Sequence, residues 1–340
     1  MILNSRKERL KRTLLHQDVD FIPTQINFTA GLSKLLLNHF QIFEKELPFH
    51  LGNHMIRVDI DYPNKFSSNK KLKYDIWGVG FDTEEEGYYA AFNPLSKNKD
   101  LDFHEWPKME NPALFAQAKK NILEFGEDYF IPPNIGFALF ERAWTLRGLD
   151  NFLMDMAIDP GYTNELLDRI TEIQLGLIHR YLDMGVDGGY FGDDYGAQKN
   201  MIFSPKMWRE YIKPRLAKLF APFTERGLPI LMHSDGQIQK ILPDLVEIGL
   251  TAINPVQPEV LNHIWLYENF AGKLAFYGGI STQTVLPFGT PAEVKQAVYD
   301  CINTLAPDRT GLLIAPSHRM MTDIPMDNIV AMMEAFQEYC

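Results

Sequence analysis

The feature that most constrains the fold of this chain is the alternation of short apolar runs with helical patterns in its second half. Each apolar run is typical of a buried strand, and a helical pattern follows each one. The runs cover residues 186–194, 228–236, 250–257, 273–281 and 310–318. Strands that alternate with helices form βαβ units around a parallel sheet, so we predict an α/β fold.

The helical patterns support this interpretation. Residues 164–184 carry an apolar stripe at helical spacing, and Gly185 suits the position just after a helix end. A second stripe predicts a final helix packed against the core, and it consists of Ile329, Met332, Met333 and Phe336.

The first half of the chain has a looser pattern. Residues 21–28 and 54–61 resemble barrel strands, and 129–144 resemble a strand that leads into a helix. A hairpin insertion is predicted near 74–93. The chain has no G-x-G-x-x-G after a strand and no phosphate-binding loop motif, which weighs against a doubly wound nucleotide-binding sheet. We therefore predict one domain over 1–340, a (β/α)8 barrel with about eight strand–helix steps.

Composition limits the partners. The 340 residues carry a net charge of −11, which argues against nucleic acid and anionic membranes as partners. Cys301 and Cys340 are the only cysteines, too few for a disulfide framework or a cysteine-based zinc site. The N-terminal residues lack a signal peptide's apolar region, and no apolar run is long enough for a membrane span. These features predict a cytoplasmic protein with a small-molecule ligand, and an acidic cleft is compatible with a homodimer.

Polar residues gather where the predicted strands end. In (β/α)8 barrels the active site lies at the C-terminal ends of the strands. His233 and Asp235 end the fifth predicted strand, and residues i and i+2 of an extended segment project to the same side. The remaining candidates at these ends are Asp59, Asp61, Glu141, Arg142, Asp193, Asp194, Tyr195, Asn254, Gln257, Ser281, Ser317, His318 and Arg319.

Structural roles compete with functional ones at these positions. A carboxylate at a strand end often caps the next helix. His318 can equally be a core histidine, and Glu141 can form an ion pair with Arg142. His233 and Asp235 are harder to explain structurally, because both project toward one point beside a glycine. Such a pair suits a metal site or an acid–base pair.

Four segments together resemble the uroporphyrinogen decarboxylase superfamily, which includes corrinoid-linked methyltransferases. They read "FGDDYGAQKNMIFSPKMWREYIKPRLAKLF", "HSDGQIQKILPDLVEIGLTAINPVQ", "YGGISTQTVLPFGTPAEVKQAV" and "LLIAPSHRMMTDIPMDNIVAMMEA". The resemblance implies a distorted (β/α)8 barrel with a deep cleft at the strand C-termini.

One branch of this superfamily decarboxylates porphyrinogens. Its members carry an arginine-rich motif, R-Q-A-G-R-Y, which binds the carboxylates of the substrate. The matching region here, "PTQINFTAGLSKLL", has Gln25 and Asn27 and no arginine. Asp61 stands near the position of the branch's pyrrole-binding aspartate, and His318 matches its strand-eight histidine. Decarboxylation, which needs no cofactor, remains the alternative function, and a non-catalytic tetrapyrrole or corrinoid binder is a second alternative.

The other branch transfers methyl groups to or from a corrinoid protein. Its thiol-specific members hold zinc with an H-x-C motif and a later cysteine. Here the motif has become His233-Ser234-Asp235, and the later cysteine is replaced near His318. A His/Asp/His set can still bind zinc, as a harder and less thiophilic site.

We therefore predict transfer of a methyl group from a small ether or amine to a corrinoid protein, with zinc assistance. The resemblance places metal ligation at His233, Asp235 and His318, and Asp194 joins these three as a catalytic residue. The predicted substrate-binding residues are Asp61, Glu141, Asp193, Tyr195 and Gln257.

Overall fold

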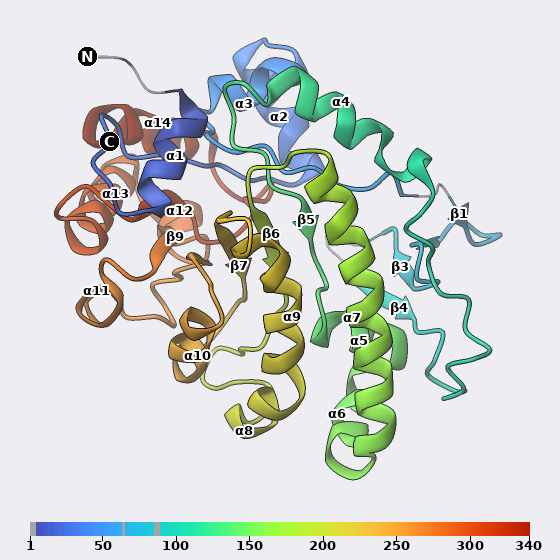
Figure 1. The fold of residues 1–340 in the computed structure, drawn as a ribbon. Helices are drawn as coiled ribbons and strands as arrows, with labels where there is room; N and C mark the ends of the chain where they lie inside the picture. Colours follow the sequence, from blue (N-terminus) through green and yellow to red (C-terminus); the bar gives the residue numbers. More distant parts are fainter. Residues whose placement is uncertain (1–4, 63–64, 85–88) are drawn as a thin grey trace.

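The computed structural model describes residues 5–62, 65–84 and 89–340 (Figure 1). Its main sheet contains six parallel strands in the order β10-β9-β8-β7-β6-β5. The strands are β5 (Asn134–Ile135), β6 (Gly189–Gly192), β7 (Ile230–His233), β8 (Ala252–Asn254), β9 (Ala275–Ile280) and β10 (Leu312–Pro316). This order follows the chain, as a barrel requires.

Two further segments close the barrel. Thr24 is bridged in parallel to Ile314 of β10 on one side and to Asn53 on the other. Residues 55–58 then pair with 130–133, directly before β5. The backbone hydrogen bonds along this seam are Gln25 N to Ile314 O, His54 N to Thr24 O, Ile56 N to Phe130 O and Val58 N to Pro132 O. With these two segments the barrel has eight strands, which confirms the predicted distorted (β/α)8 fold.

Prolines explain why the seam is irregular. Pro23 lies in the first barrel segment, and Pro132 and Pro133 come just before β5. Proline has no backbone N–H to donate to a strand ladder, so these segments form isolated bridges and a two-residue strand. The barrel is therefore distorted on this side.

Helices surround the barrel (Figure 1). The longest is α7 (Pro160–Asp183), which begins where Asp159 accepts the backbone N–H of Tyr162. α13 (Pro291–Leu305) begins with a reciprocal capping pair between Thr290 and Glu293. The other helices of eight or more residues are α1 (Arg6–Leu14), α2 (Ala30–Phe40), α4 (Ala116–Phe125), α5 (Phe140–Arg147), α6 (Leu149–Ile158), α9 (Lys213–Thr224), α11 (His263–Phe270) and α14 (Met326–Tyr339). No helix of the described residues is both long and apolar enough to cross a membrane.

Helix α1 closes the barrel at the end opposite the strand C-termini. Leu10 and Leu14 are buried together with side chains that the strands direct into the barrel. Lys7 and Lys11 each place a side-chain nitrogen 2.9 Å from Asp187, which precedes β6. The barrel interior is therefore packed at one end, and a cleft can open only at the other.

The insertion is a four-stranded antiparallel sheet of order β1-β2-β3-β4. Its strands are β1 (Lys65–Phe66), β2 (Leu72–Tyr74), β3 (Gly80–Asp82) and β4 (Ala90–Phe92). The predicted hairpin near 74–93 falls within this sheet, and its residues 85–88 lie outside the described part of the chain. Arg142 of α5 joins the sheet to the barrel through a buried ion pair with Asp75, 2.7 Å long. Asp75 is thus the ion-pair partner of Arg142, in place of the structural alternative with Glu141.

Candidate active site

Three of the predicted residues come together at the C-terminal ends of the strands. His233 is the last residue of β7, Asp235 follows in the next loop, and His318 lies just after β10. The Nε2 atom of His233 is 3.5 Å from Oδ1 of Asp235, and Nε2 of His318 is 3.6 Å from Oδ2. One ligand atom from each residue lies within 4.8 Å of the other two. We call this group the His/Asp/His cluster.

Asn254 fixes the proton arrangement of His233. The Nδ2 group of Asn254 donates to the carbonyl oxygen of Tyr277 at 3.2 Å, so its Oδ1 must be an acceptor. That oxygen lies 2.7 Å from Nδ1 of His233 and also accepts from the hydroxyl of Tyr190 at 3.0 Å. His233 therefore carries a proton on Nδ1, and its neutral form presents an Nε2 lone pair to the cluster.

These distances fit a tetrahedral metal ion. Metal–ligand bonds of about 2.1 Å in a tetrahedron separate the ligand atoms by roughly 3.4 Å. The two histidine–aspartate distances, 3.5 and 3.6 Å, are close to this value but end on different oxygens of Asp235; with one ligand atom from each residue, the three atoms lie within 4.8 Å of one another. Two imidazoles and one carboxylate leave a fourth position open, as in catalytic zinc sites. The contact from His233 to Asn254 is the outer hydrogen bond that orients a ligating histidine.

Electrostatics couple His233 to Asp235. Burial lowers the pKa of His233, but the hydrogen bond that His233 donates to Asp235 and the nearby negative charges outweigh burial and raise it well above its usual value. Burial raises the pKa of Asp235, while His233 and His318 lower it to a net value below normal. Without a metal, these two residues form an ion pair. A metal must displace the Nε2 proton, so its affinity would depend on pH.

Asp194 and Glu141 add two carboxyl groups beside the cluster. Oδ1 of Asp194 accepts the backbone N–H of Asp235 at 2.8 Å and lies 3.8 Å from Nε2 of His233. Burial, followed by the charges of Asp194 and Asp193, raises the pKa of Glu141 well above its usual value. Glu141 is therefore suited to hold a proton that a reacting group could take.

Asp193 and Tyr195 support the site from behind. Asp193 accepts the backbone N–H groups of Leu139, Phe140 and Glu141 at 3.1, 2.9 and 2.7 Å, and so binds the N-terminus of α5. Tyr195 donates its hydroxyl to the same carboxylate at 2.8 Å. Both side chains are completely buried, and their contacts hold the start of α5; their predicted contact with substrate stays a prediction.

Asp59 and Asp61, at the end of the second barrel segment, make different contacts. Asp61 accepts the backbone N–H of Gln117 in the first turn of α4, at 3.1 Å, which is a helix-capping contact. Asp59 is exposed, and its Oδ1 accepts from Asn134 of β5 at 2.8 Å. Gln257 is buried in the turn after β8, where its backbone carbonyl oxygen accepts a hydrogen bond from the backbone N–H of Leu261 at 2.9 Å.

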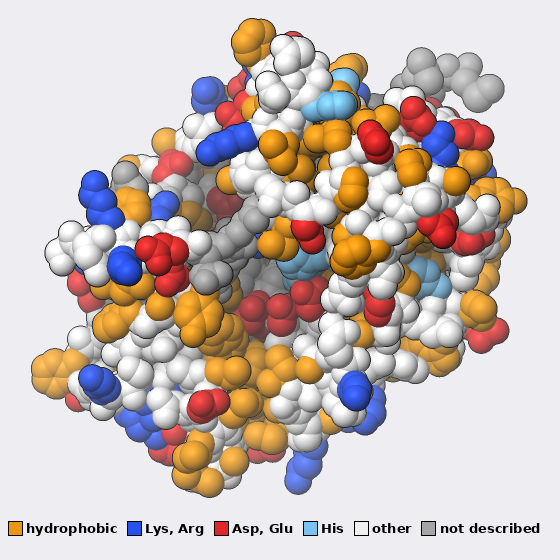
Figure 2. Space-filling model, turned by 180° about the vertical axis from the view of Figure 1, so that it is seen from behind, with side chains coloured by type: hydrophobic (Ala, Val, Ile, Leu, Met, Phe, Trp, Pro, Cys, Tyr) orange, Lys and Arg blue, Asp and Glu red, His pale blue; other side chains and the backbone are white. Residues whose placement is uncertain are grey.

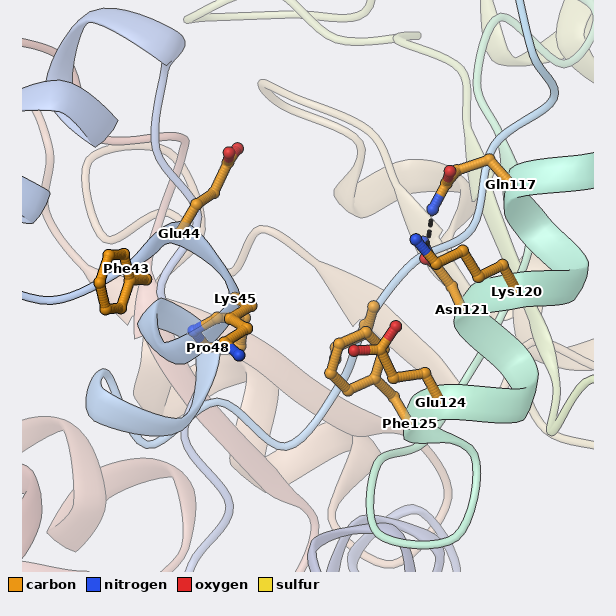
Figure 3. Close-up of a pocket in the computed structure, with 10 residues that line it drawn as sticks. Phe43, Glu44, Lys45, Pro48, Gln117, Lys120, Asn121, Glu124 and Phe125 are labelled. Atoms are coloured by element: carbon orange, nitrogen blue, oxygen red, sulfur yellow. Dashed lines mark hydrogen bonds between the residues drawn. The ribbon is translucent and has the colours of Figure 1, made fainter.

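The molecule is hollowed on the face opposite the view of Figure 1. Figure 2 shows acidic and histidine side chains gathered in this hollow. A separate cavity of about 830 Å³ lies between α4 and the segment formed by η1 (Glu44–Glu46) and α3 (Leu47–His50) (Figure 3). Its lining residues include Phe43, Lys45 and Phe125 and none of the cluster, so we do not assign the chemistry to this cavity.

A (β/α)8 barrel with converging ionisable side chains at its strand C-termini has the architecture of a barrel enzyme. The family "Uroporphyrinogen decarboxylase (URO-D)" matches residues 137–339. The chain belongs to this family.

Known relatives are distant. A uroporphyrinogen decarboxylase of Christiangramia forsetii is 22% identical over 260 residues, 73% of this chain and 71% of that protein. Another, of Ruthia magnifica subsp. Calyptogena magnifica, is 19% identical and covers 83% of this chain and 82% of that protein. Among solved structures, a methyltransferase from Methanosarcina mazei matches with a TM-score of 0.74 at 18% identity, over 99% of both chains. That match supports the fold.

Proposed function

We propose that this protein transfers a methyl group from a small methylated ether or amine to a corrinoid protein. The observation that carries the proposal is the His/Asp/His cluster, in which Asn254 orients His233 for ligation through Nε2. We infer that the cluster holds a divalent metal ion such as zinc. The corrinoid partner, a homodimer and a cytoplasmic location belong to the same proposal.

The site residues would have different roles in the reaction. A metal ion held by the cluster would act as a Lewis acid on the oxygen or nitrogen that carries the methyl group. When the bond from this atom to the methyl carbon breaks, the electron pair stays on the oxygen or nitrogen, and the methyl group passes to the acceptor. Glu141, whose pKa is raised by burial and by the neighbouring carboxylates, would protonate the leaving atom. Asp194 holds the loop of Asp235 in place.

The ligand set favours an oxygen or nitrogen leaving group over thiol chemistry. Asp235 stands where the thiol-specific branch carries cysteine, and it gives the site a hard oxygen donor. A metal with a carboxylate ligand is less suited to activating a thiol acceptor.

Porphyrinogen decarboxylation is the second candidate, because both sequence relatives above are uroporphyrinogen decarboxylases. The first barrel segment argues against it. Gln25 and Asn27 take the place of the arginine motif, and Gln25 Nε2 donates to Oδ1 of Asn27 at 3.2 Å. Asn27 in turn donates to the hydroxyl of Tyr277 at 2.8 Å. These amides offer no positive charge to a substrate with many carboxylates.

Metal content and turnover together test the proposal. We expect about one zinc or similar ion per chain by elemental analysis, lost in His233→Ala and retained in His179→Ala, which changes an exposed histidine of α7. We expect methylation of a corrinoid protein from a methoxy or methylamino compound. Absence of metal together with conversion of uroporphyrinogen to coproporphyrinogen would instead establish the decarboxylase. Stable tetrapyrrole binding without any turnover would indicate a non-catalytic binder.

A further inference from the structure

Arg57 is the only lysine or arginine in the eight barrel strands, 22–28, 53–59, 130–135 and β6 to β10. It lies between Met55, which is buried inside the barrel, and Asp59, which accepts a hydrogen bond from Asn134 of β5. Residues at alternate positions of a strand share a face, so Arg57 also projects inward. Its guanidinium carbon is 4.6 Å from the centroid of the Tyr190 ring, and its side chain is partly exposed.

Tyr190 connects Arg57 to the His/Asp/His cluster. Its hydroxyl donates to Oδ1 of Asn254, the same oxygen that holds Nδ1 of His233. The ring is almost completely buried, so it is a fixed platform for the guanidinium. Arg57 and the cluster are therefore linked through one buried side chain, because the guanidinium lies over the Tyr190 ring and the Tyr190 hydroxyl reaches the oxygen that holds His233.

We propose that Arg57 binds a carboxylate of the substrate, so that the methyl donor is a small methoxy or methylamino carboxylic acid. The Arg57 guanidinium lies over an aromatic ring, and its planar fork of N–H groups suits a planar carboxylate. The acid would lie at Arg57 and the methyl-bearing atom at the cluster. This inference rests on the proposed function, because it assigns the other end of the same substrate.

The charges around Arg57 are compatible with this orientation. Asp194 and Asp235 are on the His233 side of Tyr190, where they contact the histidines. Asp59 follows Arg57 by two residues in the same segment, close enough for their charges to attract each other. Arg57 is the cationic side chain that the barrel strands offer to the negative end of a substrate, and the methyl-bearing end would lie toward the cluster.

Binding of matched acid–amide pairs to the purified protein tests this inference. The ligands are 4-methoxybenzoate and 4-methoxybenzamide, with methoxyacetate and methoxyacetamide as a shorter pair, measured by isothermal titration calorimetry. We expect at least one acid to bind about tenfold to a hundredfold more tightly than its amide, the effect of one charge-assisted pair of hydrogen bonds. Equal affinity within both pairs would overturn the inference without any variant.

Variants locate the effect. Arg57→Met should abolish the preference for the acid, and Arg57→Lys should retain only part of it, because lysine keeps the charge and loses the planar donor pair. Arg209→Met is the control, since Arg209 pairs with Asp244 on the outer helices. A preference that persists in Arg57→Met would assign the carboxylate to another group.

The two proposals can fail separately. If the acids bind through Arg57 but no methyl group reaches a corrinoid acceptor, the proposed function fails and the carboxylate site stands. If neutral ethers donate their methyl group as well as the acids do, the carboxylate site fails and the methyltransferase function stands.

Discussion

Nδ1 of His233 lies 2.7 Å from Oδ1 of Asn254, an amide whose orientation is set by the backbone of β9. Through this contact, a strand two positions away in the barrel decides which imidazole nitrogen faces the cleft. The consequence is an imidazole ring that is already oriented for ligation before any metal arrives, which lowers the cost of ordering the site.

Replacing Asn254 by alanine should therefore weaken metal binding by about tenfold to a hundredfold, because His233 loses the acceptor that fixes its tautomer. The dissociation constant for zinc, measured by competition with a chelator, checks this. Asn269→Ala is a matched control, since Asn269 contacts only its own helix through Trp265 among the hydrogen bonds found for it. Unchanged zinc affinity in Asn254→Ala would remove the basis for the assigned tautomer.

Glu141→Gln should reduce kcat/KM by about a hundredfold to ten-thousandfold, the usual contribution of a general acid, while metal content stays the same. The acid must be protonated to act, and the pKa of Glu141 is raised. Activity of the unmodified protein should thus fall as pH rises through that raised pKa, and the activity of the variant should not show this fall. Measurement of kcat/KM as a function of pH for both proteins tests whether Glu141 is the general acid. Full activity in Glu141→Gln would exclude the role.

Asp193→Ala should lower the free energy of unfolding by about 3–5 kcal/mol, because it leaves buried N–H donors at the start of α5 without an acceptor. Guanidinium unfolding monitored by circular dichroism gives the value. Asp323→Ala, at an exposed loop position, should change it by less than about 0.5 kcal/mol. Similar stability of the two variants would mean that Asp193 does not hold the helix.

His54 should make stability depend on pH. Burial lowers the pKa of this histidine to about 4 from 6.5, and its Nε2 is buried without a hydrogen-bond partner. Between these values the unfolded chain binds a proton that the folded chain does not, so stability falls as pH falls. The loss should reach about 3 kcal/mol between pH 6.5 and pH 4.

Urea unfolding at pH 7 and pH 4.5 measures this loss. His54→Gln should show a smaller decrease than the unmodified protein, because its side chain does not titrate. His179→Gln, at an exposed position of α7, should leave the decrease unchanged. If the decrease in His54→Gln equals that of the unmodified protein, other groups account for the acid sensitivity.

Local pattern was enough to predict the barrel strands and the pairing of His233 with Asp235. Both depend on the alternation of side chains along a strand, which is visible in a few consecutive residues. The second barrel segment shows the limit of this reasoning, because Asp59 and Asp61 are two residues apart and the alternation places both on the same side. The two residues differ only because the segment ends before Asp61. The backbone N–H of Asp61 donates to the carbonyl oxygen of Leu114, a residue far along the chain.

Other site residues escaped prediction for related reasons. Arg142 cannot reach Glu141 because adjacent residues of a helix point in different directions, and its partner Asp75 lies in the insertion. The role of Asn254 depends on a carbonyl of the neighbouring strand, which no local pattern reveals. Arg57 could have been found, since alternation from Met55 already places it inside the barrel.

Helix α1 has a consequence for the order of events. Leu10 and Leu14 fill the barrel at the end opposite the cluster, so a small molecule in the cleft cannot leave through that end. Under the proposed reaction, the corrinoid protein would reach the methyl group through the same cleft opening by which the donor enters. The donor would then have to enter first, and the demethylated product could leave only after the partner withdraws. Steady-state kinetics with both reactants varied should accordingly show ordered binding.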